Sequence, residues 1–275
     1  MKLAYYIKKR SLRNDGRIAD VLKRLRDGGI DVSDVMDAGG MLMPDTDVLL
    51  SFGGDGTFLS AARAAIPAGT AVIGVNLGRL GFLSENTPED VAQALLRGEY
   101  EVEERGLVQV AIDGETPPGW SPYALNEMNV SRISAAMLGV DVVVGEDKLP
   151  TYWADGLIVA TSSGSTAYSL SVGGPICTPD TSLLIIAPVS PHNLNVRPLI
   201  VPENSVISVT PHSREGDVNL TLDNRNYTIP SGTRLTVSAA PVRLRRIRTG
   251  KSDFFNALRS RLLWGMDVRN SGEPQ

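Results

Sequence analysis

The sequence has few of the residues that build metal sites and disulfides. It contains one cysteine, Cys177, and two histidines among 275 residues. A lone cysteine excludes an internal disulfide and any metal site made of several cysteines. His192 and His212 have no partners at metal-ligand spacing, so we assign neither a catalytic role. One cysteine fits a reducing compartment, and we expect a cytoplasmic protein with no metal site of its own.

Long apolar runs and a surplus of positive charge are also missing. No window approaches the roughly 18 apolar residues of a membrane span, and the first residues lack the apolar stretch of a signal peptide. The net charge is −4, from 27 Lys and Arg against 31 Asp and Glu. This negative net charge gives no overall positive potential that would attract nucleic acid. The local exception, Arg243 to Arg248, alternates basic and apolar residues, which predicts an edge strand with a solvated face.

The first third of the chain predicts an α/β domain. Short apolar runs alternate with helical patterns, and this order indicates a doubly wound parallel sheet covered by helices on both faces. Thr87 and Pro88 have the types expected at a helix N-cap and first helical position. The predicted strands are 3–7, 48–52 and 71–75, and the predicted helices are 16–26, 57–65 and a third that begins at Pro88.

From about Glu101 the pattern changes to short strands separated by proline, serine and glycine, which predicts a mostly β second domain. A final helical pattern, 254–263, is expected to pack back on the first domain. We therefore predict an α/β nucleotide and phosphate domain at 1–100 plus 252–275, and a mostly β domain at 101–251. The predicted strands of the second domain are 108–112, 139–144, 157–160, 183–186, 206–209, 218–222 and 235–237.

A glycine-rich turn is the most informative local feature. Gly53, Gly54 and Gly56 follow an apolar strand, and a helix pattern starts at Thr57. Glycines let a backbone approach a ligand closely, and the amides at a helix start bind phosphate. Asp55, in the middle of the turn, is a carboxylate of the kind that phosphoryl transfer needs. The alternative is an ordinary tight turn, in which aspartate is also favoured.

Three further polar groups are candidates. Asn126-Glu127 offers a carboxylate that suits a vicinal diol such as that of ribose. The hydroxyl-rich stretch from Asp155 to Tyr168 follows a strand into a helix start, which suits polar or anionic groups. Asp223 ends an alternating strand. Taken singly, each has an ordinary alternative: a solvated turn, a Ser/Thr cap with Tyr168 in the core, and a hairpin turn.

Taken in order, the motifs resemble the NAD kinase family across nearly the whole chain. Gly-Gly-Asp-Gly alone is shared with lipid kinases, but the ordered set is highly specific. The matching segments are 53–57, 74–82, 126–127, 154–176, 191–192, 197–198, Asp223 and 254–256.

The resemblance implies an ATP-dependent kinase that phosphorylates the 2′-hydroxyl of the adenosine ribose of NAD, giving NADP and ADP. The family's proposed base matches Asp55, its ribose-binding pair matches Asn126 and Glu127, and a carboxylate near nicotinamide, often completed by a neighbouring subunit, matches Asp155. Phosphate binding is implied for Gly53, Gly54, Gly56 and Thr57. NAD binding is implied for Gly56, Phe82, Asn126, Glu127, Asp155, Ser163, Thr166, Ala167, Tyr168, Ser169, Leu170, Ser171 and Asp223.

The resemblance further implies Mg²⁺ carried with ATP, small-molecule nucleotides as partners, and a homodimer or homotetramer. Two positions depart from many members: Trp153 replaces Arg or Gln, and Asn224 replaces Gly or Ser. NADH use and inhibitor response therefore stay open. Separately, the sequence does not decide between ATP and polyphosphate as donor, because some members of the family accept polyphosphate. Two other functions also stay open at this point, a lipid or sphingoid-base kinase and a dinucleotide sensor without catalysis.

Overall fold

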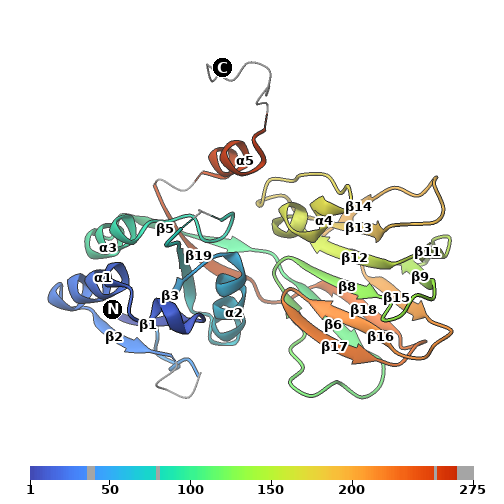
Figure 1. The fold of residues 1–275 in the computed structure, drawn as a ribbon, viewed down its shortest axis with the longest axis horizontal. Coiled ribbons are helices and arrows are strands. Elements are labelled where there is room, and N and C mark those ends of the chain that lie inside the picture. Colours follow the sequence, from blue (N-terminus) through green and yellow to red (C-terminus); the bar gives the residue numbers. More distant parts are fainter. Residues whose placement is uncertain (36–40, 79–80, 251–252, 265–275) are drawn as a thin grey trace. The chain divides into compact units, whose positions relative to one another are not determined.

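The structure is a computed structural model that describes residues 1–35, 41–78, 81–250 and 253–264. The chain divides into two compact units, one made of Met1–Glu104 with Arg245–Gln275 and the other of Arg105–Leu244. Figure 1 shows their elements along the chain. Within the described residues, no helix has both the length and the apolar character needed to cross a membrane.

A six-stranded sheet forms the centre of the first unit, in the order β2-β1-β3-β4-β19-β5. The pairs β1–β2, β1–β3, β3–β4 and β4–β19 are parallel. Every residue of β3 and β4 is buried, as expected for parallel strands covered on both faces. The strands are β1 (Lys2–Ile7), β2 (Asp31–Asp34), β3 (Val48–Phe52), β4 (Ala71–Val75), β5 (Tyr100–Arg105) and β19 (Leu244–Thr249).

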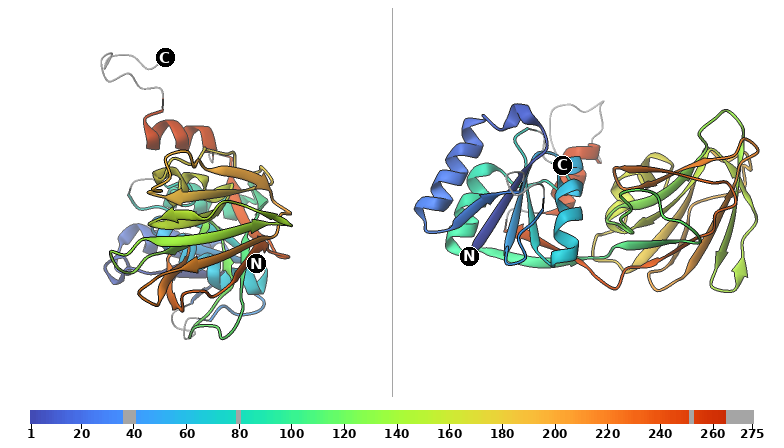
Figure 2. Two further views of the ribbon diagram at one scale, coloured as in Figure 1. Left: turned by 90° about the vertical axis from the view of Figure 1, so that its right-hand side faces the viewer. Right: turned by 90° about the horizontal axis from the view of Figure 1, so that it is seen from below.

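Helices flank this sheet, and Figure 2 shows α1 and α2 on its opposite faces. The expected start of α3 is confirmed: Thr87 is the N-cap, its side chain accepts the Asp90 N–H, and Pro88 is the first residue. The helices are α1 (Gly16–Asp27), α2 (Asp55–Ala65), α3 (Pro88–Arg97) and α5 (Phe254–Leu262), with short 3-10 helices η1 (Arg10–Leu12) and η2 (Ile66–Ala68).

The expectation of an edge strand at Arg243 to Arg248 is wrong, because β19 lies between β4 and β5. The strand tolerates this position because its buried cation is neutralised. Arg246 is 2% exposed; its Nη1 donates to Glu103 Oε1 at 2.7 Å, and its Nη2 pairs with Glu85. A buried guanidinium held by two carboxylates avoids the cost of an unpaired charge.

The second unit consists of two antiparallel sheets. The first has the order β10-β9-β15-β18-β6-β7, with β11 also paired to β9, and the second has the order β14-β13-β12-β8-β16-β17. The first sheet contains β6 (Val108–Ile112), β7 (Tyr123–Ala124), β9 (Leu138–Val144), β10 (Asp147–Lys148), β11 (Tyr152–Ala154), β15 (Ile207–His212) and β18 (Leu235–Ala239). The second contains β8 (Glu127–Ser131), β12 (Gly156–Thr161), β13 (Leu183–Val189), β14 (Leu199–Pro202), β16 (Val218–Leu222) and β17 (Arg225–Ile229).

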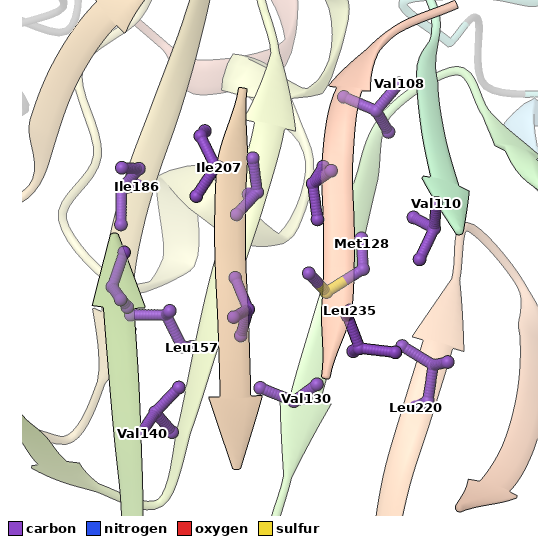
Figure 3. Packing of buried hydrophobic residues seen from close by; sticks show 14 of the residues in the cluster. Val108, Val110, Met128, Val130, Val140, Leu157, Ile186, Ile207, Leu220 and Leu235 are labelled. Carbon is purple, nitrogen blue, oxygen red and sulfur yellow. The ribbon is translucent and has the colours of Figure 1, made fainter. Parts of the chain in front are cut away.

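The apolar side chains of both sheets form one shared core. Figure 3 shows Val140 of one sheet near Leu157 of the other, and Leu235 of the first sheet next to Leu220 of the second. The other face of β12 and β13 buries a smaller cluster, which includes Ile158 and Ile185. Between β12 and β13 the chain forms the short helices η3 (Ser163–Thr166) and α4 (Tyr168–Ser171). The predicted mostly β second domain is confirmed.

Candidate active site

The backbone conformation and the close contact with Thr57 both require a glycine at position 53. Its φ is +150°, and a β-carbon there would stand 2.5 Å from Thr57 Oγ1. Its N–H donates to the Val75 carbonyl at 2.9 Å, which fixes the chain leaving β3 against β4. The helix start was predicted two residues too late: α2 begins at Asp55 and not at Thr57.

Gly54 and Gly56 are different, because nothing in the described part of the chain requires a glycine at either place. Gly54 has an ordinary φ of −82°, and Gly56 is helical. A β-carbon on either residue would meet no atom within 4 Å. Glycine inside a helix costs about 1 kcal/mol relative to alanine. Because Gly54 and Gly56 carry no side chains, a ligand can approach the main chain closely on both sides of Asp55.

The carboxylate of Asp55 is bound by the loop that follows β4. Its Oδ2 accepts the Phe82 N–H at 2.9 Å, and its Oδ1 accepts the N–H groups of Leu83 at 3.1 Å and Ser84 at 2.9 Å. Gly81 leaves room for this arrangement, since a β-carbon there would stand 1.7 Å from Oδ1. Sequence reasoning missed these bonds. The sequence feature that could have indicated them is the second glycine-containing segment, 74–82, which includes Gly81.

The same loop is held to the sheet by two asparagines. The Asn76 N–H donates to the Asn86 carbonyl at 2.8 Å and its side chain to the Ser84 carbonyl at 3.2 Å. The Asn86 side chain donates to the Gly74 carbonyl at 2.8 Å. The ring of Phe82 lies 6.1 Å from that of Phe254 in α5. Positions 79 and 80 of the matched segment lie outside the described residues.

In the second unit, the structure brings Asp223 to Asn126 and Glu127. Asp223 lies in the two-residue turn between β16 and β17, so the ordinary hairpin interpretation is also correct. Its φ is +52°, and aspartate tolerates this left-handed conformation better than most residues. Its carboxylate accepts the N–H groups of Leu125 at 2.9 Å, Asn126 at 2.7 Å and Glu127 at 3.4 Å.

Glu127 is a buried acid with an unsatisfied oxygen. The residue is 8% exposed, and its Oε2 has no hydrogen-bond partner among the residues that the structure describes. Burial, with a further contribution from the charge of Asp223, raises the pKa of Glu127 to about 8. Burial also raises the pKa of Asp223, but its three N–H donors oppose that shift. We therefore place the proton of this pair on Glu127, which can then act as donor or acceptor.

The turn formed by η3 packs directly on the main chain of Asn126. Thr161 Oγ1 donates to the Leu125 carbonyl at 2.6 Å and accepts the Gly164 N–H at 3.1 Å. A β-carbon on Gly164 would stand 2.1 Å from the Asn126 carbonyl oxygen. Sequence reasoning missed both Thr161 and Gly164, although the hydroxyl-rich stretch contains them.

The other candidates of this stretch lie on η3 and α4, next to that contact. Tyr168 donates its N–H to the Glu127 carboxylate, and its side chain is 41% exposed, so the alternative of Tyr168 in the core is wrong. Ser169 is fully buried, and its Oγ has no partner. The remaining candidates differ in burial. Ser163 is buried, Thr166, Ala167 and Leu170 are half-buried, and Ser171 is exposed.

Asp155 lies at the far end of the same strand pair. In the register of β12 with β8, Ala160 pairs with Glu127 and Gly156 with Ser131. Asp155 is five residues from Ala160, and strand residues rise about 3.3 Å each, so Asp155 and Glu127 lie about 17 Å apart. Asp155 accepts the Arg132 Nε–H at 2.7 Å. Only an extended ligand could contact both acids.

Trp153 lies in β11, two residues before Asp155. It is 45% exposed, and it pairs across the sheet with Gly139. A β-carbon on Gly139 would stand 2.9 Å from the indole ring, so the ring lies flat over the glycine. As for metals, the described part of the chain holds no group of three or more His, Cys, Asp or Glu side chains suited to a metal ion.

Comparison with known proteins gives the family. Residues 36–100 match the family model of the ATP-NAD kinase N-terminal domain, and residues 125–249 match that of the ATP-NAD kinase C-terminal domain. The NAD kinase of Bacteroides fragilis is 41% identical over 229 residues, which cover 82% of this chain and 79% of the relative. That of Heliobacterium modesticaldum is 41% identical over 80% of this chain and 79% of the relative.

Solved structures agree on the fold. A yeast NADH kinase in complex with NADH has a TM-score of 0.83 at 21% identity, over 98% of this chain and 90% of its own. An NAD kinase from Archaeoglobus fulgidus in complex with ATP has a TM-score of 0.76 at 24% identity, over 94% and 97%. At these identities the likeness concerns the fold alone, whereas the sequence relatives establish kinship. The chain belongs to the NAD kinase family.

Proposed function

We propose that this protein transfers the γ-phosphoryl group of ATP to the 2′-hydroxyl of the adenosine ribose of NAD, giving NADP and ADP. ATP-dependent phosphorylation of NAD follows from its family. The observation in the structure that supports it most is the glycine turn at the carboxyl end of β3. There Gly54 and Gly56 leave open main chain on either side of Asp55, as close contact with a phosphate requires.

Asp55 is the proposed base of this reaction. A sugar hydroxyl is a weak nucleophile, and a carboxylate that orients it and takes its proton assists attack on phosphorus. A carboxylate offers about four acceptor positions, and the loop from Phe82 to Ser84 uses three of them. One position is thus left for the hydroxyl, and the loop holds the carboxylate in a defined orientation.

Glu127 and Asp223 are proposed to hold the adenosine ribose. The carboxylate of Asp223 accepts the N–H groups of 125–127, so its proposed role is to fix the main chain of these residues. Glu127 keeps one oxygen without a partner, and a ribose hydroxyl can satisfy it. Ser163, Thr166, Ala167 and Tyr168 are proposed as the adenine-side wall. Asp155, about 17 Å away along the strand pair, is proposed to lie near nicotinamide.

The remaining proposals concern Mg²⁺, the fold details and the assembly. We propose that Mg²⁺ arrives with ATP, bound mainly by phosphate oxygens, and spreads charge together with the glycine turn. The contact of Phe82 with Phe254 supports a C-terminal helix packed on the first unit, and α1 and α2 on opposite faces support a doubly wound sheet. A cytoplasmic homodimer or homotetramer is proposed from the family resemblance and the single cysteine.

A coupled assay tests the proposal. The protein is incubated with Mg²⁺ and either ATP or polyphosphate, each with NAD or NADH, and NADP(H) is measured. Formation of NADP from ATP and NAD is expected. Parallel reactions with labelled ATP and a diacylglycerol test a lipid kinase. Binding of NAD by calorimetry without any NADP formed would replace the proposal with a dinucleotide sensor.

A further inference from the structure

Lys8 lies next to the glycine turn at the carboxyl edge of the first sheet. It directly follows β1, whose last residue, Ile7, pairs in parallel with Phe52, the last residue of β3. The next residue along each strand is Lys8 on one side and Gly53 on the other. Neighbouring strands are about 4.8 Å apart, so the Lys8 main chain leaves the sheet beside the turn.

The side chain of Lys8 extends over the start of α2. Its Nζ donates to Ser60 Oγ at 3.3 Å, and Ser60 Oγ donates to the Gly56 carbonyl at 3.1 Å. A single hydroxyl therefore separates the ammonium from the turn of helix that begins at Gly56. The open positions at Gly54 and Gly56 belong to this same part of the molecule.

The contacts of Lys8 within the protein contribute little to the stability of the fold. In the described part of the chain, the recorded hydrogen-bond partner of Lys8 is the neutral hydroxyl of Ser60, at 3.3 Å. The N-terminal end of a helix carries partial positive charge, so a cation there gains nothing from the helix dipole. An anion bound at the turn would instead be attracted by both the ammonium and the helix start.

We propose that Lys8 binds the phosphate chain of the nucleoside triphosphate at the glycine turn. The inference rests on the proposed function, which puts the donor at Gly53, Gly54 and Gly56. Lysine suits this task because its ammonium is a compact charge on a flexible stem, which can leave Ser60 for a phosphate oxygen without any change in the main chain. A charge-assisted bond of this kind offsets the charge of the transferred group.

The test compares Lys8→Met with three other variants. Lys8→Met is expected to raise the KM for MgATP, and the Kd for MgATP measured by calorimetry, by about 10- to 100-fold, and to leave the KM for NAD within about twofold. Lys8→Arg is expected to restore most of the affinity. Lys9→Met removes another exposed charge at the next position, and Ser60→Ala removes the neutral hydroxyl that Lys8 contacts; both are expected to resemble the wild type.

Two results would overturn the inference: an unchanged Kd and KM for MgATP in folded Lys8→Met, or an equal loss in Lys9→Met. Equal loss would show a general effect of surface charge. The proposed function fails differently, through a wild-type protein that binds MgATP but forms no NADP. In that case the calorimetric comparison of Lys8→Met with Lys9→Met still decides the role of Lys8. Circular dichroism of each variant confirms that it is folded.

Discussion

Gly81 lies so close to Asp55 that no side chain fits between them: a β-carbon on Gly81 would stand 1.7 Å from Asp55 Oδ1. The carboxylate fills this space and accepts three N–H groups from the loop at 82–84. The proposed base of the reaction therefore also helps to hold this loop, together with Asn76 and Asn86. Substitutions on either side of the contact separate the two roles.

Gly81→Ala is expected to displace the Asp55 carboxylate without removing it. The β-carbon has to move either the carboxylate or the loop, because the contact is with both oxygens. We expect turnover to fall about tenfold or more through lost orientation, and the free energy of unfolding to fall by about 1–3 kcal/mol. Gly78→Ala is the control, since its β-carbon would stand 3.9 Å from Asn76 Oδ1. Wild-type turnover in Gly81→Ala would contradict the importance of this contact.

Asp55→Asn is expected to keep NAD binding and to lose most turnover, on the order of a hundredfold or more. The amide group also brings N–H donors toward loop N–H groups that need acceptors, so we expect lower stability, by about 1–3 kcal/mol. Steady-state kinetics and urea unfolding measure the two effects. Asp20→Asn, an exposed change on α1, controls for loss of charge. Near-normal turnover in Asp55→Asn would remove Asp55 from its proposed role as base.

Gly56→Ala is expected to make the protein more stable and less active. Among residues 1–35, 41–78, 81–250 and 253–264, nothing obstructs a β-carbon at this helical position, and alanine favours the helix by up to about 1 kcal/mol. The same methyl group would occupy the surface proposed for phosphate, so the KM for MgATP should rise. Gly16→Ala is a matched control, because Gly16 begins α1 and its β-carbon also meets no atom within 4 Å. Unchanged kinetics in Gly56→Ala would argue against a phosphate at this turn.

Glu127 is expected to make stability depend on pH. Its ordinary pKa is 4.5, and burial beside Asp223 raises the pKa to about 8. Between these values the unfolded chain has lost the proton that the folded protein keeps. Stability relative to Glu127→Gln should therefore be greatest below about pH 4.5 and fall as pH rises toward 8, by at most about 1.4 kcal/mol per pH unit. Above that range the difference should level off.

Urea unfolding of wild type and Glu127→Gln from pH 5 to 9 measures this difference. Glu146→Gln, an exposed change in the turn between β9 and β10, controls for the removal of a carboxylate. A difference between wild type and Glu127→Gln that is independent of pH would mean that the acid is already ionised in the folded protein. Kinetics with NAD on the same variant report separately on the ribose contact: a raised KM for NAD is expected.

Much of the local structure could be predicted from residue types at short spacing. The apolar runs 48–52 and 71–75 predicted buried strands, and Thr87 with Pro88 predicted the start of α3. The glycine turn could be identified as well, since a strand, three glycines and a helix start follow each other within ten residues. These features depend on backbone conformation and side-chain periodicity, which neighbouring residues determine.

Contacts between distant residues could not be predicted in this way. The loop at 82–84 that binds Asp55 is 27 to 29 positions away, and Asp223 reaches N–H groups 96 to 98 positions away. The basic strand β19 was misplaced at an edge because its alternation suggested solvent, whereas Glu85 and Glu103 neutralise Arg246 inside the sheet. The sequence alone determined the local conformation of the segments with a clear pattern, such as the buried strands 48–52 and 71–75, the glycine turn and the start of α3. Only the tertiary structure decided which polar groups meet, because hydrogen bonds and charges are satisfied by whatever partners the packed chain brings near.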